Sequence, residues 1–282
     1  MTDFSRFPPT ELRDFLKAFG WHTLPEGLSD RLYVMENNQF DGRQLVFPMD
    51  DDYPDYGDRI GLIFGKFSEI HNKRIDDVVF LAQTAGDDKI ALQFQSRRGD
   101  DSFLPLNYVV SAVSAAQQML LSSACTILHP QLHHPRLSRG EAQQFIDNTR
   151  FRHTDQGSFV INISSPVFAL DLQPPLIEDG DASEPFVRRA IASMQEGVSN
   201  LVRAIEDDSL DDYVNRIRSD DRPELSSNLC EALTRFDEEE SVDSVVLSVD
   251  WAMILPPTNT AVRRVTIKKA YFPRIEEVWR EL

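Results

Sequence analysis

The chain has 282 residues and is strongly acidic, with 46 Asp and Glu residues against 29 Lys and Arg and a formal net charge of −17. A body this negative repels phosphate backbones, which disfavours sequence-independent binding to nucleic acid. The hydrophobic content of 41% and the 18 Phe residues exclude a disordered chain and indicate one large or two medium domains.

The first residues predict a cytoplasmic protein. Met1–Phe4 contain neither the basic nor the apolar region of a signal peptide. The only cysteines are Cys125 and Cys230, each among residues typical of helices, so we expect no disulfide framework and a reducing compartment.

Residues 1–86 are predicted to form an N-terminal αββα unit. Thr10 and Glu11 favour a helix start, and Gly20 favours its end. A turn rich in Asn, Asp and Gly joins two short extended runs, which predicts a hairpin. The expected elements are a helix at 10–19, strands at 31–35 and 43–48, and helices at 56–70 and 75–81.

This order resembles the small double-stranded-RNA-binding-type fold of HicA-like toxin domains. The resemblance rests on the helix end Leu16–Trp21 and on the hairpin ending Val46, Phe47 and Pro48. It covers about a quarter of the chain. The catalytic histidine of that family, at the start of the first strand, is absent because Ser29–Arg31 stand in its place.

An acidic run, Asp50–Asp52, precedes the predicted helix at 56–70. Such a run is one candidate for a cation site, but it lacks the glycine and the final glutamate of an EF-hand loop. Carboxylates are also favoured electrostatically before a helix N-terminus. We therefore expect capping and solvation here, and no bound metal.

Residues 87–282 are predicted to form a larger α+β domain, in which an antiparallel or mixed sheet packs against long helices. The extended runs alternate apolar and polar residues, which indicates strands with one face open to water. Strands are expected at 89–95, 158–164, 245–251 and 262–268, and helices at 102–128, 138–149, 184–206, 225–236 and 275–282.

The segment 102–128 contains no charged side chain over 27 residues. About one small polar residue per turn argues against a membrane span. Apolar residues recur at helical spacing on one side, and we expect them to face the core: Leu106, Val109, Val110, Val113, Ala116, Leu120, Ala124, Ile127 and Leu128. The other side is neutral and polar, and we expect it to be covered by the fold or by a partner: Asn107, Ser111, Ser114, Gln118 and Ser122.

Basic residues concentrate between positions 129 and 153, where four of the six histidines lie. Guanidinium groups and turn amides can hold an anion, which predicts an anion-binding or ligand-binding site. Its candidate residues are Arg136, Arg139, Arg150, Arg152, His153 and Ser158. The alternative is a loop whose arginines bridge to acidic neighbours. Pro130 and Pro135 disfavour a zinc site, because they interrupt the helix that would align the histidines.

The chain as a whole resembles a family of uncharacterised bacterial cytosolic proteins. The resemblance rests on Thr154–Val160, read as Thr-x-x-Gly-Ser-Phe-Val, and on Asn228–Leu233, read as Asn-Leu-Cys-Glu-Ala-Leu. It implies a bacterial, cytoplasmic protein and no particular activity.

Phosphate loops, dinucleotide fingerprints and the Gly-x-Ser-x-Gly elbow do not occur in the sequence, and we expect no cofactor. The first hypothesis is a non-enzymatic accessory subunit of a bacterial assembly, concerned with defence or stress, that binds a protein partner or itself. The alternative is a protein that responds to nucleic acid or nucleotides through the basic residues. A third is an enzyme with a dispersed site, which short motifs do not reveal.

Overall fold

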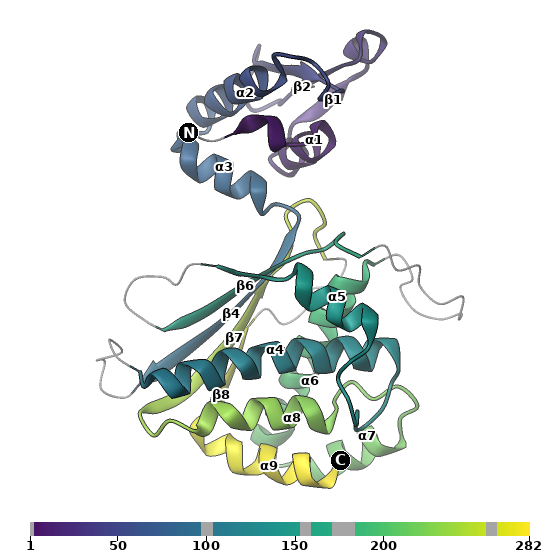
Figure 1. The fold of residues 1–282 in the computed structure, drawn as a ribbon, viewed down its shortest axis with the longest axis vertical. Helices are drawn as coiled ribbons and strands as arrows, with labels where there is room; N and C mark the ends of the chain where they lie inside the picture. Colours follow the sequence, from purple (N-terminus) through teal and green to yellow (C-terminus); the bar gives the residue numbers. More distant parts are fainter. Residues whose placement is uncertain (1–2, 97–103, 153–158, 171–183, 258–263) are drawn as a thin grey trace. The chain divides into compact units, whose positions relative to one another are not determined.

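The computed structural model describes residues 3–96, 104–152, 159–170, 184–257 and 264–282. It divides the chain into two compact units, each with its own hydrophobic core (Figure 1). Unit 1 comprises Met1–Asp87 with Ala252–Pro256, and unit 2 comprises Asp88–Trp251 with Pro257–Leu282. Both combine helices with an antiparallel sheet, so the predicted α+β class is confirmed.

Unit 1 packs three helices against a three-stranded sheet of order β1-β2-β3. The predicted αββα order omits the short first strand. The elements are α1 (Pro9–Ala18), β1 (His22–Leu24), β2 (Leu32–Glu36), β3 (Gln44–Pro48), α2 (Tyr56–Ile70) and α3 (Ile75–Gln83).

Aromatic side chains form much of the core of unit 1. The ring of Phe15 on α1 lies 5.3 Å from that of Phe67 on α2, centroid to centroid. Trp21 is buried, and its indole N–H donates to His71 Nε2 at 3.3 Å. The chain turns from α1 towards β1 at Gly20, whose φ of 81° suits glycine because it lacks a Cβ.

Unit 2 is a five-stranded sheet of order β5-β6-β4-β7-β8 with helices gathered on one side (Figure 1). The strands are β4 (Asp87–Ser96), β5 (Arg150–Arg152), β6 (Val160–Pro166), β7 (Val242–Asp250) and β8 (Arg264–Lys268). The helices are α4 (Leu106–Leu128), α5 (Gly140–Asn148), α6 (Phe186–Glu206), α7 (Leu210–Ser219), α8 (Ser227–Thr234) and α9 (Phe272–Glu281).

Alternation along the central strands directs apolar side chains towards the helices. Ile90, Leu92 and Phe94 on β4 are all buried. In the antiparallel register they lie opposite Val249, Leu247 and Val245 of β7, which are also buried. A strand presents alternate residues to opposite faces, so polar side chains such as Gln93 and Ser248 occupy the face away from the helices.

Candidate functional site

Helix α4 lies among the other helices of unit 2 and contacts α5, α6 and α8. It begins after Pro105 and ends at His129. None of the described helices is both long and apolar enough to cross a membrane. Its contacts with three helices make α4 a packed element of unit 2. The N-terminal and C-terminal halves of α4 differ in how far they are buried.

The C-terminal half of α4 is enclosed by the fold. Every residue from Ser122 to Thr126 is buried. The hydroxyl of Ser122 donates to the Gln118 carbonyl at 2.7 Å, and that of Thr126 donates to the Ser122 carbonyl at 2.9 Å. Because each hydroxyl is satisfied within its own helix, small polar residues can be buried here at little cost. For this half, the prediction that both sides are covered is confirmed.

The N-terminal half of α4 exposes its apolar residues instead. Leu106 is 77% exposed, Val110 62% and Val113 38%. We call these three residues the α4 strip. The residues of this half of α4 that face inward are Tyr108, Ala112 and Ala115. The prediction that Leu106, Val110 and Val113 face the core is therefore wrong, because a large Tyr and two small Ala residues make the closer contact with the neighbouring elements.

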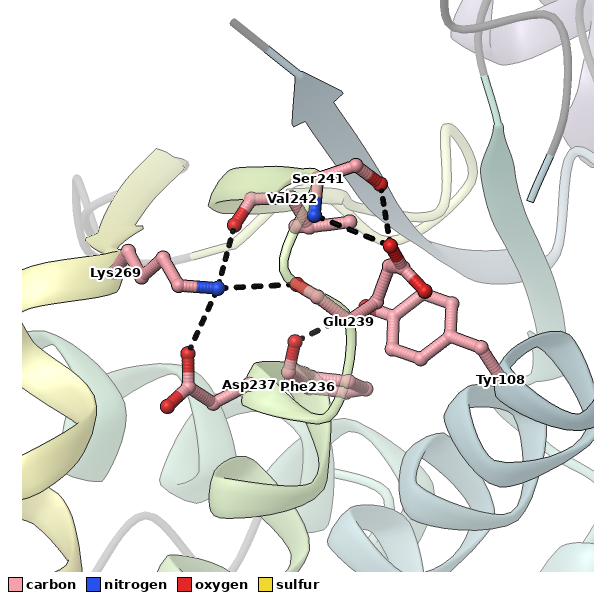
Figure 2. Close-up of polar contacts among 7 residues, drawn as sticks. All are labelled: Tyr108, Phe236, Asp237, Glu239, Ser241, Val242 and Lys269. Carbon is pink, nitrogen blue, oxygen red and sulfur yellow. Dashed lines mark hydrogen bonds and ion pairs between the residues drawn. The ribbon is translucent and has the colours of Figure 1, made fainter. Parts of the chain in front are cut away.

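Tyr108 anchors this half of the helix to the loop before β7 (Figure 2). Its hydroxyl donates to the Phe236 carbonyl at 3.0 Å. Burial raises the pKa of Tyr108, and the carboxylates of Glu239, Glu238 and Asp237 raise it further. The phenol consequently stays protonated and remains a hydrogen-bond donor beside an acidic loop.

Lys269 holds the same loop from its other side (Figure 2). Its ammonium group donates to the Glu239 carbonyl at 3.1 Å and lies 3.4 Å from the Asp237 carboxylate. The Glu239 carboxylate accepts hydrogen bonds from the amide and the hydroxyl of Ser241. These contacts fix the loop, while the side chains of Glu238 and Glu240 remain exposed.

The five polar residues predicted to face a partner are distributed over different environments. Asn107 and Ser114 are exposed beside the α4 strip, whereas Ser111 and Gln118 are half-buried. Ser122 is fully buried. The amide of Gln118 lies 3.3 Å from the Glu231 carboxylate on α8. The solvent-facing part of α4 is therefore its apolar strip together with Asn107, Ser114 and Gln117.

The histidines after α4 mainly hold the fold together. His134 is buried, and its backbone N–H and carbonyl pair with the Asn228 side chain at 2.7 and 3.1 Å. Its ring Nε2 lies 3.0 Å from the Thr126 hydroxyl. Burial lowers the pKa of His134 to about 4, and positive charge on Arg139 acts in the same direction. His134 is accordingly neutral near pH 7.

His133 and Ser227 form a pair that resembles a base and a nucleophile, with His133 Nδ1 2.8 Å from Ser227 Oγ. Ser227 is only 2% exposed, so a substrate carbonyl does not reach its hydroxyl. Among the described residues, no carboxylate forms a hydrogen bond that would orient the His133 ring. The pair is better explained as a contact that seats the N-terminus of α8.

The arginines predicted to bind an anion occupy two places. Arg136 and Arg139 are exposed in the loop before α5. Arg150 and Arg152 lie on one face of the edge strand β5, opposite Ser164 and Asn162 of β6. The two other predicted members of this site, His153 and Ser158, lie outside the described residues.

The remaining candidate groups offer little chemistry. Asp50, Asp51 and Asp52 have carboxylate oxygens within 4.8 Å of one another, in a loop that is largely exposed. Cys125 and Cys230 are both buried free thiols. Burial raises the pKa of Cys125 and raises that of Cys230 to about 12. A thiol of this kind is a poor nucleophile, because the reactive thiolate is disfavoured.

A shallow depression of about 300 Å³ lies between α6 and α7. Its polar lining includes Asn200, Arg203, Asp207, Asp212 and Arg216. Glu224 engages both Asn200 and Arg216, at 3.0 and 2.8 Å. Because Asn200 and Arg216 are already engaged by Glu224, the depression is a weaker candidate than the α4 strip.

No family model, no curated protein and no solved structure matches the chain.

Proposed function

We propose that this chain is a non-enzymatic interaction subunit that binds a protein partner through the α4 strip. The observation that carries the proposal is the exposure of Leu106 and Val110 on a helix without a charged side chain. Exposed helix faces in an acidic protein ordinarily carry Glu, Lys or Arg. An apolar seam at this position is typical of a surface that a second protein covers.

Burial of the strip supplies a favourable free energy for binding. Fully burying a Leu or Val side chain contributes roughly 1.5–3 kcal/mol. Two or three such side chains at the centre of a contact can serve as its main anchors, surrounded by polar residues that contribute less. Asn107 and Ser114 border the strip and would lie at the edge of such a contact.

The first prediction is that removing the strip releases the partner. Replacing Leu106 and Val110 with Ser leaves the core of unit 2 unchanged, because both side chains are exposed. The experiment compares wild-type and variant chains as baits in extracts of the native host, with bound proteins quantified by mass spectrometry. We expect one protein to be retained by the wild type and to fall by about tenfold or more with the double variant.

Val46→Ser in unit 1 is the matched control, because Val46 is an exposed strand valine of similar size, 42% exposed. The control variant should retain the partner. Equal retention by the wild type and the α4 double variant would contradict the proposal, and so would the absence of any stoichiometric partner. The bacterial cytoplasmic setting and a role in defence or stress stay predictions.

The alternative function, binding of nucleic acid or nucleotides, is favoured by one observation. Arg150 and Arg152 project from the same face of β5, which is an edge strand. Two guanidinium groups at this spacing suit successive phosphates. The net charge of −17 opposes such binding.

The interaction-subunit proposal predicts that a labelled single-stranded oligonucleotide does not bind, even near 50 mM salt. Fluorescence anisotropy measures this directly. Binding that weakens steeply towards about 200 mM salt would establish the alternative instead. Loss of that binding in an Arg150→Gln, Arg152→Gln variant would assign it to β5.

A further inference from the structure

The surroundings of the α4 strip indicate the chemistry of its partner; this inference rests on the proposed function above. Helix α8 and the loop that follows it contact α4 along one side. Glu231, Glu238 and Glu240 lie on this side, and the last two are exposed. Helix α5 also contacts α4, but the residue before it, Arg139, lies near Cys125 in the other half of α4. The acidic border of the strip is therefore the side of α8 and the loop that follows it.

Most cations on the α8 side of α4 are already paired with carboxylates. Lys269 is held by Asp237 and by two loop carbonyls. Arg235 lies 3.5 Å from the Glu231 carboxylate. The exposed Glu238 and Glu240 leave this edge negative, as is the chain as a whole.

The spacing of the exposed residues fits a single partner helix. Leu106, Val110, Val113 and the exposed Gln117 follow one another at steps of four, three and four. These are the steps of the d and a positions of a heptad, which form the seam between two helices. The seam covers 11 residue steps, or about 16 Å at 1.5 Å per residue. Three turns of a partner helix would cover it.

We propose that the α4 strip binds an amphipathic helix of a partner protein, with apolar residues in the seam and Lys or Arg along one edge. The apolar residues would cover Leu106 and Val110, and the basic residues would face Glu238 and Glu240. Complementary charge fixes the register of such a pair and accelerates its formation.

A second copy of this chain fits the same seam less well. In an antiparallel symmetric pair of α4 helices, the acidic edges of the two copies, with Glu238 and Glu240, lie on the same side of the contact. Like charges would then approach one another along the contact, and each copy also carries a net charge of −17. A basic helix converts the same carboxylates into favourable partners.

The test uses two synthetic helical peptides of about 18 residues with the same leucine seam. One peptide carries Lys at the edge positions and the other carries Glu. Fluorescence anisotropy measures the binding of each peptide to the full-length chain near 50 mM NaCl. We expect the Lys peptide to bind about tenfold more tightly than the Glu peptide, and its affinity to fall as salt is raised towards 500 mM.

Two variants separate specific docking from general attraction to an acidic protein. Leu106→Ser with Val110→Ser should abolish binding of the Lys peptide, whereas Val46→Ser should leave it unchanged. Glu238→Lys with Glu240→Lys should reduce the preference for the Lys peptide several-fold. Equal binding of the Lys peptide to the strip variant would overturn the inference, because the attraction would then be non-specific.

Two further outcomes would also overturn it. Equal binding of the Glu and Lys peptides would refute the basic partner but leave the proposed function standing, since that is tested separately by the protein retained from extract. If neither peptide binds, no basic helix docks on the strip. In that case, light scattering measures the mass of the wild-type chain and of the Leu106→Ser, Val110→Ser variant. A wild-type dimer that becomes a monomer in the variant would show that the strip binds a second copy of this chain.

Discussion

Replacing Arg188 with Met is expected to destabilise unit 2 by about 3–5 kcal/mol, the largest effect that we predict for a single residue. Arg188 lies in the first turn of α6, and Asp88 lies near the start of β4. The Arg188 Nε and Nη2 atoms donate to the two Asp88 carboxylate oxygens at 2.7 and 2.8 Å. The two side chains are only 1% and 0% exposed, so the substitution would remove the bidentate guanidinium partner of a buried carboxylate.

The Arg188 guanidinium also lies over the Trp251 ring, 4.8 Å from its centroid. Asp88 and Trp251 are two of the three residues of unit 2 that border unit 1 in the sequence, the third being Pro257. One side chain of α6 thus holds Asp88 and Trp251 against the helix layer of unit 2.

Urea unfolding followed by circular dichroism measures the loss for Arg188→Met, and amide exchange along α6 assigns it to unit 2. The double variant Asp88→Leu, Arg188→Met is the control, because it removes both charges and should recover a large part of the loss. A loss below about 1 kcal/mol in Arg188→Met would refute a desolvated, bidentate pair.

Acidification is expected to destabilise unit 2 through His134, by up to about 3 kcal/mol. The pKa of His134 is about 4 in the folded chain, below the ordinary histidine value of 6.5. Its stabilising contribution is therefore complete above pH 6.5 and is lost as the pH falls from 6.5 to 4. Within this range the unfolded chain binds the proton and the folded chain resists it.

The cause of this shift is burial, reinforced by the positive charges of Arg139, His129 and His133. His134→Gln cannot ionise, so its free energy of unfolding should depend less steeply on pH between 6.5 and 4 than that of the wild type. His22→Gln is the matched control, because His22 is an exposed histidine of unit 1. Identical pH slopes for the wild type and His134→Gln would show that His134 is not held neutral.

Regular hydrophobic spacing was sufficient to predict the long elements. Val187, Ile191, Met194, Val198 and Leu201 form one helical stripe in the sequence, and all five are buried on α6. Helix α7 was missed although Leu210, Tyr213, Val214 and Ile217 carry the same spacing and are buried. It follows α6 after a turn at Asp208, whose φ is 53°. In the sequence, α6 is a clear long helix, whereas the many charged residues of α7 make it resemble a polar loop.

Two short strands carried too little pattern to be predicted. β1 and β5 each have three residues, and their pairing depends on partners 10 to 14 positions away. Alternation over three residues does not distinguish a strand from a loop. The strand positions of Arg150 and Arg152 therefore became visible only with the fold.

The orientation of α4 could not be obtained from hydrophobicity alone. Leu106 and Val110 are more apolar than Ala112 or Tyr108, so a sequence pattern places the larger aliphatic residues inside. The fold reverses this order, because the Tyr108 hydroxyl finds the Phe236 carbonyl, more than 100 residues away. The neutrality of the helix was visible in the sequence, and the identity of its exposed residues was not.

The most direct test of the account is photochemical carbene footprinting of Leu106, Val110 and Val113, in the purified chain and in native extract. We predict strong labelling of all three side chains in the purified chain and protection in the extract. Val46 should be labelled equally in both conditions. If the α4 strip is labelled to the same extent in extract as in isolation, no partner covers it, and the chain does not act through this surface.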